Sequence, residues 1–142
     1  MHMIQSPQAI QVLRDGITLD ATVAWRQERE SWAWVVEIGC TDFDLVEAQA
    51  HDAFEALCLA REQLEPRGWR IGVAGAQADV WPSGMAREQG GGLRAYRMSG
   101  DRVGDLVDVF EPVDPATVTT VAEQRAETER RYDEIRRSAQ NR

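Results

Sequence analysis

The stretch ITLDATVAW, residues 17–25, decides the fold class. Its odd-numbered positions are all apolar, whereas three of its four even-numbered positions are polar. Successive side chains of a β-strand point to opposite faces, so this period of two predicts a strand with one buried face. The apolar face comprises Ile17, Leu19, Ala21, Val23 and Trp25.

Segments on both sides of this stretch predict partner strands. AIQVL, residues 9–13, is joined to it by Arg14-Asp15-Gly16, a sequence that favours a tight hairpin turn. Downstream, SWAWVVEIG, residues 31–39, alternates again and predicts a third antiparallel strand. Its apolar face comprises Trp32, Trp34, Val36 and Ile38. A short fourth strand is a candidate in CTDFDLVEAQ, residues 40–49.

The apolar spacing changes from about Gln49 onward and predicts a helix. Apolar residues then recur three and four positions apart, as on the buried stripe of an amphipathic helix. They are Ala50, Ala53, Phe54, Leu57, Ala60 and Leu64. Glu65-Pro66 and Gly68 end this helix, and WRIGVAG, residues 69–75, returns to a strand.

The last third of the chain predicts two more strands and a long helix. The strands are LRAYRM, residues 93–98, and DLVDVFE, residues 105–111, joined by Ser99-Gly100-Asp101. Asp114 followed by Pro115 is typical of a helix start, which places the helix over residues 115–139. We therefore expect one α+β domain over residues 1–142: an antiparallel sheet of about five to six strands packed against one amphipathic helix, plus a long C-terminal helix.

Charge and composition restrict the classes of partner. The 142 residues carry 24 acids and 16 bases, a net charge of −8, and no lysine. Nucleic acids and anionic membrane surfaces are bound chiefly by basic residues, so we expect neither as a partner, and a basic protein suits this charge better. No apolar run is long enough for an export signal or a membrane span. Two cysteines without a CxxC pair fit a cytoplasmic protein.

The sequence contains no complete catalytic constellation. His51 is the one histidine placed to act as a base, since His2 lies at the terminus. Glu47, His51 and Glu55 would share a face if the helix began early enough, and two carboxylates with an imidazole can bind a metal. We expect a solvated helix start there instead, and therefore no metal and no cofactor. Ser83 lacks the preceding glycine of a nucleophile elbow.

The segment DVWPSGMAREQGGG, residues 79–92, interrupts the apolar periodicity and is the first candidate binding surface. Trp, Met and Arg are enriched in the cores of protein interfaces, so we expect a contact surface here. Two alternatives stay open: Trp81 and Met85 fold back over the sheet, or the glycines present N–H groups to an anion. Because the segment after the glycines predicts a strand, we expect a flexible arm back to the sheet and not an anion site. The candidate residues are Asp79, Trp81, Pro82, Ser83, Gly84, Met85, Arg87, Glu88, Gly90, Gly91 and Gly92.

The second candidate surface is acidic. Residues 42–55 contain no arginine or lysine, and their acids are Asp42, Asp44, Glu47, Asp52 and Glu55. On a lysine-free chain such a run suits a docking face for a basic protein, although an ordinary solvated surface explains it as well. A further acidic stretch, residues 101–114, has only Arg102 for balance.

Residues 68–96 resemble a family of small uncharacterised bacterial proteins. The shared pattern is a strand, then D-V-W/Y-P-S-G-M, then a glycine-rich return that ends in an aromatic residue, here Tyr96. The resemblance covers about a fifth of the chain and implies no established reaction. Where relatives show an Arg-Arg pair ahead of the aspartate, this chain has Gln77 and Ala78, so the resemblance implies no anion site at those positions.

These features predict a non-catalytic, acidic protein-binding domain, most concretely an immunity-type protein that neutralises a bacterial toxin by direct binding. The alternative is a small-ligand-binding protein or an enzyme that uses residues 79–92. A deep pocket with a buried acid beneath that segment would favour the alternative. A homo-oligomer formed through the C-terminal helix is a third hypothesis.

Overall fold

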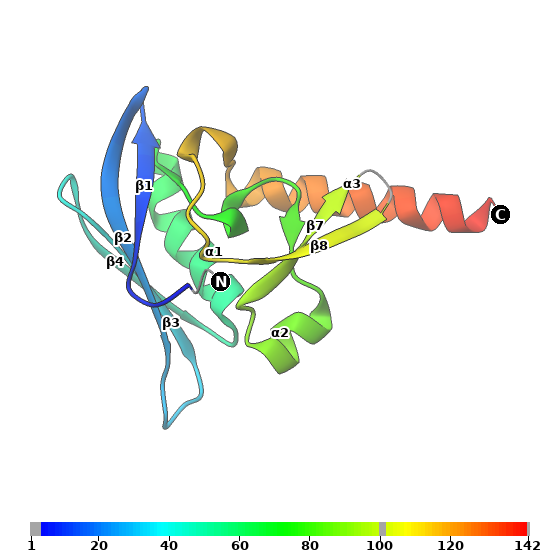
Figure 1. The fold of residues 1–142 in the computed structure, drawn as a ribbon, viewed down its shortest axis with the longest axis horizontal. Helices are drawn as coiled ribbons and strands as arrows, with labels where there is room; N and C mark the ends of the chain where they lie inside the picture. Colours follow the sequence, from blue (N-terminus) through cyan, green and yellow to red (C-terminus); the bar gives the residue numbers. More distant parts are fainter. Residues whose placement is uncertain (1–3, 100–101, 142) are drawn as a thin grey trace.

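A computed structural model describes residues 4–99 and 102–141 and shows an α+β fold (Figure 1). The described strands form two antiparallel sheets, of order β4-β3-β2-β1-β5 and β6-β7-β8. The strands are β1 (Gln8–Arg14), β2 (Ile17–Gln27), β3 (Trp34–Cys40), β4 (Phe43–Ala50), β5 (Arg70–Ile71), β6 (Val80–Trp81), β7 (Arg94–Ser99) and β8 (Arg102–Asp108). The helices are α1 (Ala53–Leu64), α2 (Gly84–Gly90) and α3 (Val121–Gln140), with short 3-10 helices η1 (Glu65–Arg67), η2 (Ala74–Ala76) and η3 (Pro115–Thr117). The predicted fold class is confirmed, and the second sheet was not foreseen.

Strand β2 carries the alternation that its sequence predicts. Ala21 and Val23 are buried, whereas Thr22 between them is exposed. The strand pairs with β1 on one side and β3 on the other, as expected. Ile17 is the exception on the apolar face, because it lies at the hairpin turn and stays 62% exposed.

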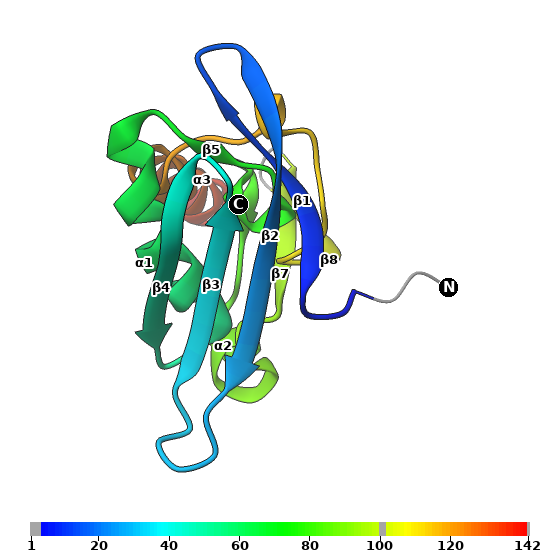
Figure 2. The same cartoon turned by 90° about the vertical axis from the view of Figure 1, so that its left-hand side faces the viewer.

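Helix α1 covers one face of the larger sheet, where it packs on β3 and β4. No described element covers the opposite face, onto which Figure 2 looks directly. An antiparallel sheet can be hydrated on one side, which is why β2 alternates instead of being apolar throughout. The core between sheet and helix includes Val36, Ile38, Phe54 and Leu57.

Trp32 does not join the apolar face predicted for residues 31–39. It lies before β3, in the turn between β2 and β3, with φ of 60° and 69% of its surface exposed. Trp34 and Val36 do lie on the predicted inner face and pack in the core. The correction arises because β3 begins at Trp34, so the alternation does not extend back to Trp32.

Helix α1 begins at Ala53, not near Gln49, because β4 continues through Ala50 and pairs there with Trp34. The weakly indicated fourth strand is therefore a full strand of 8 residues. Asp52 forms the N-cap, since its carboxylate accepts the Glu55 backbone N–H at 2.9 Å.

Strand β5 is shorter than WRIGVAG predicts, because the chain passes very close to its neighbours after Ile71. A Cβ at Gly72 would lie 2.5 Å from the carbonyl oxygen of Gln11 and 2.6 Å from that of Val113. Residues 74–76 then form η2. Both predicted strands are present, but β8 begins and ends three residues earlier than residues 105–111, and Ser99 of the predicted turn belongs to β7. Gly100 and Asp101 of that turn lie outside the described residues.

The C-terminal helix begins at Val121, six positions after the predicted start. Asp114 does cap a helix, but only the three-residue η3, and the backbone at Val118 is extended. Thr120 caps α3 by accepting the Glu123 backbone N–H at 3.2 Å. Within residues 4–99 and 102–141, no helix has both the length and the apolar character that crossing a membrane requires.

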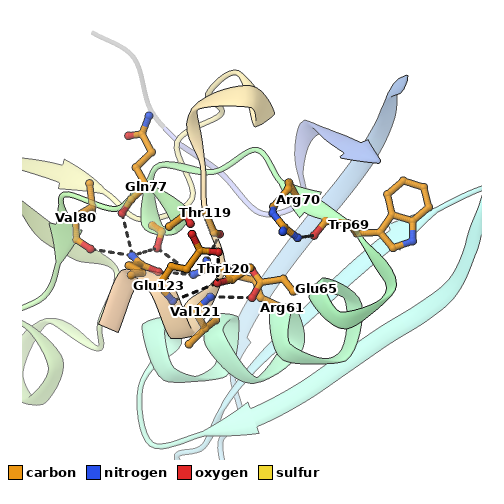
Figure 3. A network of polar contacts seen from close by, with 12 residues as sticks. Arg61, Glu65, Trp69, Arg70, Gln77, Val80, Thr119, Thr120, Val121 and Glu123 are labelled. Atoms are coloured by element: carbon orange, nitrogen blue, oxygen red, sulfur yellow. Dashed lines mark hydrogen bonds and ion pairs between the residues drawn. The ribbon is translucent and has the colours of Figure 1, made fainter. Parts of the chain in front are cut away.

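A buried polar cluster fastens α3 to the rest of the fold (Figure 3). Arg61 of α1 has no exposed surface and donates to Glu65 at 2.9 Å and to the side-chain oxygen of Gln124 at 2.7 Å. The other carboxylate oxygen of Glu65 accepts the backbone N–H of Val121 at 2.8 Å. Gln124 in turn donates to backbone carbonyls of residues 75–80. Buried charge is tolerated here because each polar group has a partner.

Candidate functional site

Residues 79–92 contain β6 and, between β6 and β7, the helix α2, which was not predicted. The Ser83 hydroxyl accepts the Ala86 backbone N–H at 3.0 Å and caps the helix start. Gly91 ends the helix with φ of 67°, the left-handed conformation that glycine adopts most easily. The candidate segment is therefore an ordered helix between two strands.

Asp79 lies in the turn just before β6 and is paired with β7. The Nη1 atom of Arg97 on β7 donates to both Asp79 carboxylate oxygens, at 2.9 and 3.0 Å. Its Nη2 atom donates to the side-chain oxygen of Gln77 at 2.7 Å. These bonds hold the residues just before β6 against β7.

Trp81 and Arg87 turn towards α1. The ring of Trp81 packs edge-on against Phe54, with centroids 5.0 Å apart. The Arg87 guanidinium lies over both rings, 5.1 Å from the Phe54 centroid and 5.5 Å from that of Trp81. Its Nη1 atom is also 3.8 Å from the Asp52 carboxylate and 3.5 Å from that of Glu55. These contacts fasten α2 to the first turn of α1.

The glycines at the end of the segment are packed and do not form a flexible arm. A Cβ at Gly91 would lie 2.6 Å from the Trp34 ring, and one at Gly92 would lie 2.5 Å from the Asp52 carboxylate. Gly91 also accepts the Ala53 backbone N–H at 2.7 Å. Their N–H groups do not form an anion cradle either, because that of Gly92 donates to the Ala86 carbonyl at 3.0 Å.

The outer side of α2 forms an apolar groove with the small sheet. The groove has a volume of about 440 Å³, and its walls include Met85, Ala86, Leu93, Arg94, Tyr96 and Leu106. Met85 is 67% exposed and Leu106 is 46% exposed. Met85 was a candidate from the sequence, whereas Leu93 and Leu106 were assigned only to strands. The exposure of Leu93 and Leu106 depends on how β8 pairs with β7 at the edge of the small sheet. The sequence around each residue does not reveal this pairing.

A second hollow, of about 270 Å³, lies on the other side of α2. Gln27 at the end of β2 and Trp34 at the start of β3 line it on one side. Glu88 and Gln89 of α2 line it on the other. The exposed side chain of His51 also lines this hollow. Helix α2 therefore lies between an apolar hollow and a polar one.

The acidic candidates separate into two groups. The exposed group, on and just before the edge strand β4, comprises Asp42, Asp44 and Glu47. Asp52 is buried and Glu55 half-buried, and both face Arg87. Glu47 and Glu55 consequently belong to different elements and do not share a helical face with His51.

The described residues contain no prepared metal site, and the buried thiol of Cys58 is unreactive at neutral pH. No three His, Cys, Asp or Glu side chains within them are grouped so that they could hold a metal ion. Cys58 is fully buried on α1, and desolvation raises the pKa of its thiol to about 12. Known protein families and curated proteins were compared with the sequence, and none matches it.

Proposed function

We propose that this chain is a non-catalytic protein-binding domain of the immunity type, which neutralises a bacterial toxin by binding it directly. The apolar groove beside α2 carries this proposal. Met85 and Leu106 expose large apolar side chains there, and the polar Gln89 and Arg94 stand beside them. An apolar centre with a polar margin is the usual composition of a protein interface.

The groove is ordered before a partner arrives. Helix α2 is capped at both ends and is fastened to α1 through Arg87 and Gly91. A surface that is already in place avoids the cost of ordering a loop on binding. This supports direct binding by the segment.

The charge of the chain indicates the kind of partner. A net charge of −8, with exposed acids at Asp42, Asp44 and Glu47, attracts a basic protein and accelerates its approach at low salt. A cytoplasmic location belongs to the same proposal, because both cysteines, Cys40 and Cys58, are free thiols. The family resemblance of residues 68–96 likewise stays a prediction.

A second function, binding of a small apolar molecule, is favoured by the size of the groove. Its volume of about 440 Å³ lies in the range of small-molecule sites. However, neither Asp79 nor Arg87 lines the groove, because Asp79 is paired with Arg97 and Arg87 with Asp52 and Glu55. Protein binding is therefore the better-supported function.

Co-expression with the products of neighbouring genes tests the proposal. We expect the chain to protect growth against one of them, to form a stable complex with it, and to bind it more weakly at high salt. Met85→Glu places a charge in the groove and should weaken binding by roughly tenfold or more. Ile17→Glu is the matched control, because Ile17 is 62% exposed at the far end of β2.

Three results would overturn the proposal. The first is that no neighbouring gene product binds the chain. The second is a bound partner whose affinity Met85→Glu leaves unchanged. The third is saturable binding of a small apolar molecule in the groove without any protein complex, which would establish the second function instead.

A further inference from the structure

Trp32 is the most exposed of the large hydrophobic residues in the described chain, at 69%. It lies in the turn that joins β2 to β3, at the end of a hairpin that projects beyond α2 (Figure 2). Tryptophan is usually largely buried, so an indole displayed at the tip of a hairpin needs an explanation. Packing among residues 4–99 and 102–141 does not supply one.

The backbone holds Trp32 in place although its ring has little contact with the fold. Its φ of 60° is unusual for a bulky residue and has an energetic cost. The Trp32 N–H donates to the Glu28 carbonyl at 3.0 Å, and the Gln27 side chain donates to the Trp32 carbonyl at 3.1 Å. A second backbone hydrogen bond, from Glu28 to the Ala33 carbonyl at 2.8 Å, closes the turn. The backbone that carries the exposed indole is therefore fixed.

The hairpin is continuous with the surface proposed above. Gln27 and Trp34, at the base of the hairpin, share the polar hollow of about 270 Å³ with Glu88 and Gln89 of α2. Helix α2 thus has the hairpin on one side and the apolar groove on the other. A single partner that contacts α2 can reach Trp32 as well.

The charges around this hairpin identify the group that would meet the ring. Arg26 already forms ion pairs with Glu28 at 3.1 Å and with Glu37 at 2.8 Å. Beyond it the tip carries Arg29 and Glu30, and α2 adds the exposed Glu88. Arg87 of α2 lines the same hollow but is paired with Asp52 and Glu55, so acids still outnumber bases here. A tryptophan face beside carboxylates favours a cation, because the ring quadrupole and the carboxylates both attract positive charge.

We infer that Trp32 is a second contact point of the interface, whose ring receives an arginine or lysine side chain of a basic protein partner. This inference rests on the proposed function for its biological setting. It adds an element that the sequence did not mark, and it names the group that the partner supplies. A guanidinium is the better fit, because it stacks on an aromatic face as well as carrying charge.

Substitutions at Trp32 separate a cation platform from a simple apolar anchor. We expect Trp32→Ala to weaken binding of the identified toxin by roughly tenfold, and Trp32→Phe to weaken it less, since a smaller π-face remains. Trp32→Leu keeps apolar area without a π-face and should bind as poorly as Trp32→Ala. Ile17→Ala removes an equally exposed side chain at the opposite end of β2 and should change nothing.

A short polyarginine peptide provides a second measurement that does not need the toxin. The wild-type chain should bind it more tightly than Trp32→Ala and Trp32→Leu do, at equal salt, with a glycine-serine peptide of the same length as the uncharged control. Circular dichroism of each variant checks that the fold is unchanged.

The outcomes distinguish this inference from the proposed function. A toxin that binds wild type and Trp32→Ala equally leaves the function standing and overturns the inference. If no neighbouring gene product binds, the function fails, and the polyarginine comparison decides the inference alone. Equal affinity of Trp32→Leu and Trp32→Phe in either measurement contradicts a cation platform.

Discussion

Arg61 and Gln124 meet at 2.7 Å inside the protein although they are 63 positions apart in the sequence. Neither side chain has any exposed surface. Glu65 completes the arrangement, because it balances the charge of Arg61 and caps the first residue of α3, Val121. The cluster joins α1 to α3 by directional bonds where apolar packing alone would leave the angle between them free.

Replacing Arg61 with methionine should destabilise the protein strongly. The variant leaves the carboxylate of Glu65 buried without its cation, and such a broken pair costs about 3–5 kcal/mol. Urea unfolding measures the loss. Arg67→Met is the control, since Arg67 is exposed just beyond α1 and should change stability by only about 0.5 kcal/mol. A loss below about 1 kcal/mol for Arg61→Met would mean that the cluster does not hold α3.

Gly92→Ala and Gly90→Ala should have different effects on the free energy of unfolding. A Cβ at Gly92 would meet the Asp52 carboxylate at 2.5 Å on a backbone with φ of 70°, so we expect a loss of about 2 kcal/mol or more. A Cβ at Gly90 meets nothing within 4 Å and lies in α2, so alanine there should be neutral or gain up to about 1 kcal/mol. Thermal unfolding compares the two. Equal melting temperatures would show that Gly92 is not packed against α1.

The two thiols should react at very different rates. Cys58 is fully buried and its pKa is raised to about 12, so it stays a protonated thiol at neutral pH. Cys40 is only half-buried near the end of β3. A thiol reagent should modify one cysteine per native chain at neutral pH and both in denaturant. Rapid modification of Cys58 in the native protein would indicate that α1 opens readily.

Ionisation of Glu123 should make the stability of the fold depend on pH. Hydrogen bonds from Thr119 and Thr120 lower the pKa of its carboxyl below the ordinary value. Since the pKa is lower in the folded state, the ionised group stabilises the protein above the unfolded pKa, and this contribution is lost as pH falls through the folded pKa. Wild type should therefore exceed Glu123→Gln in stability at neutral pH, and the two should converge in acid. Glu129→Gln, exposed on the same helix, should show a smaller effect at neutral pH.

Strands whose two faces differ were predictable from the sequence. The alternation around Val23 and its partner Ile38 exists because one face of the sheet packs on α1 and the other meets solvent. Helix starts were harder, because several residues can cap. Asp114 has the expected chemistry and caps η3, but Thr120 with Glu123 is the capping pair that begins α3.

The candidate surface was found by its unusual composition, but its shape was not predictable. Helix α2 has no fully buried residue, so it carries no apolar stripe, and only Ser83 and Gly91 at its ends signal it. The groove needs Leu106 beside Met85, and this neighbourhood depends on how β7 and β8 pair. The prediction for Trp32 was wrong because it extended the apolar alternation two residues too far, from Trp34 back into the turn.

Under the proposed function, the contacts of Gly91 and Arg87 with α1 predict the kinetics of binding. Opening the segment would break the hydrogen bond from Ala53 to Gly91 and the ion pair of Arg87, so we expect a partner to meet the surface that it occupies in the complex. We expect association in one step, at a rate proportional to partner concentration and free of a slow conformational phase. Substitutions at the exposed positions of α2 should then change mainly the lifetime of the complex.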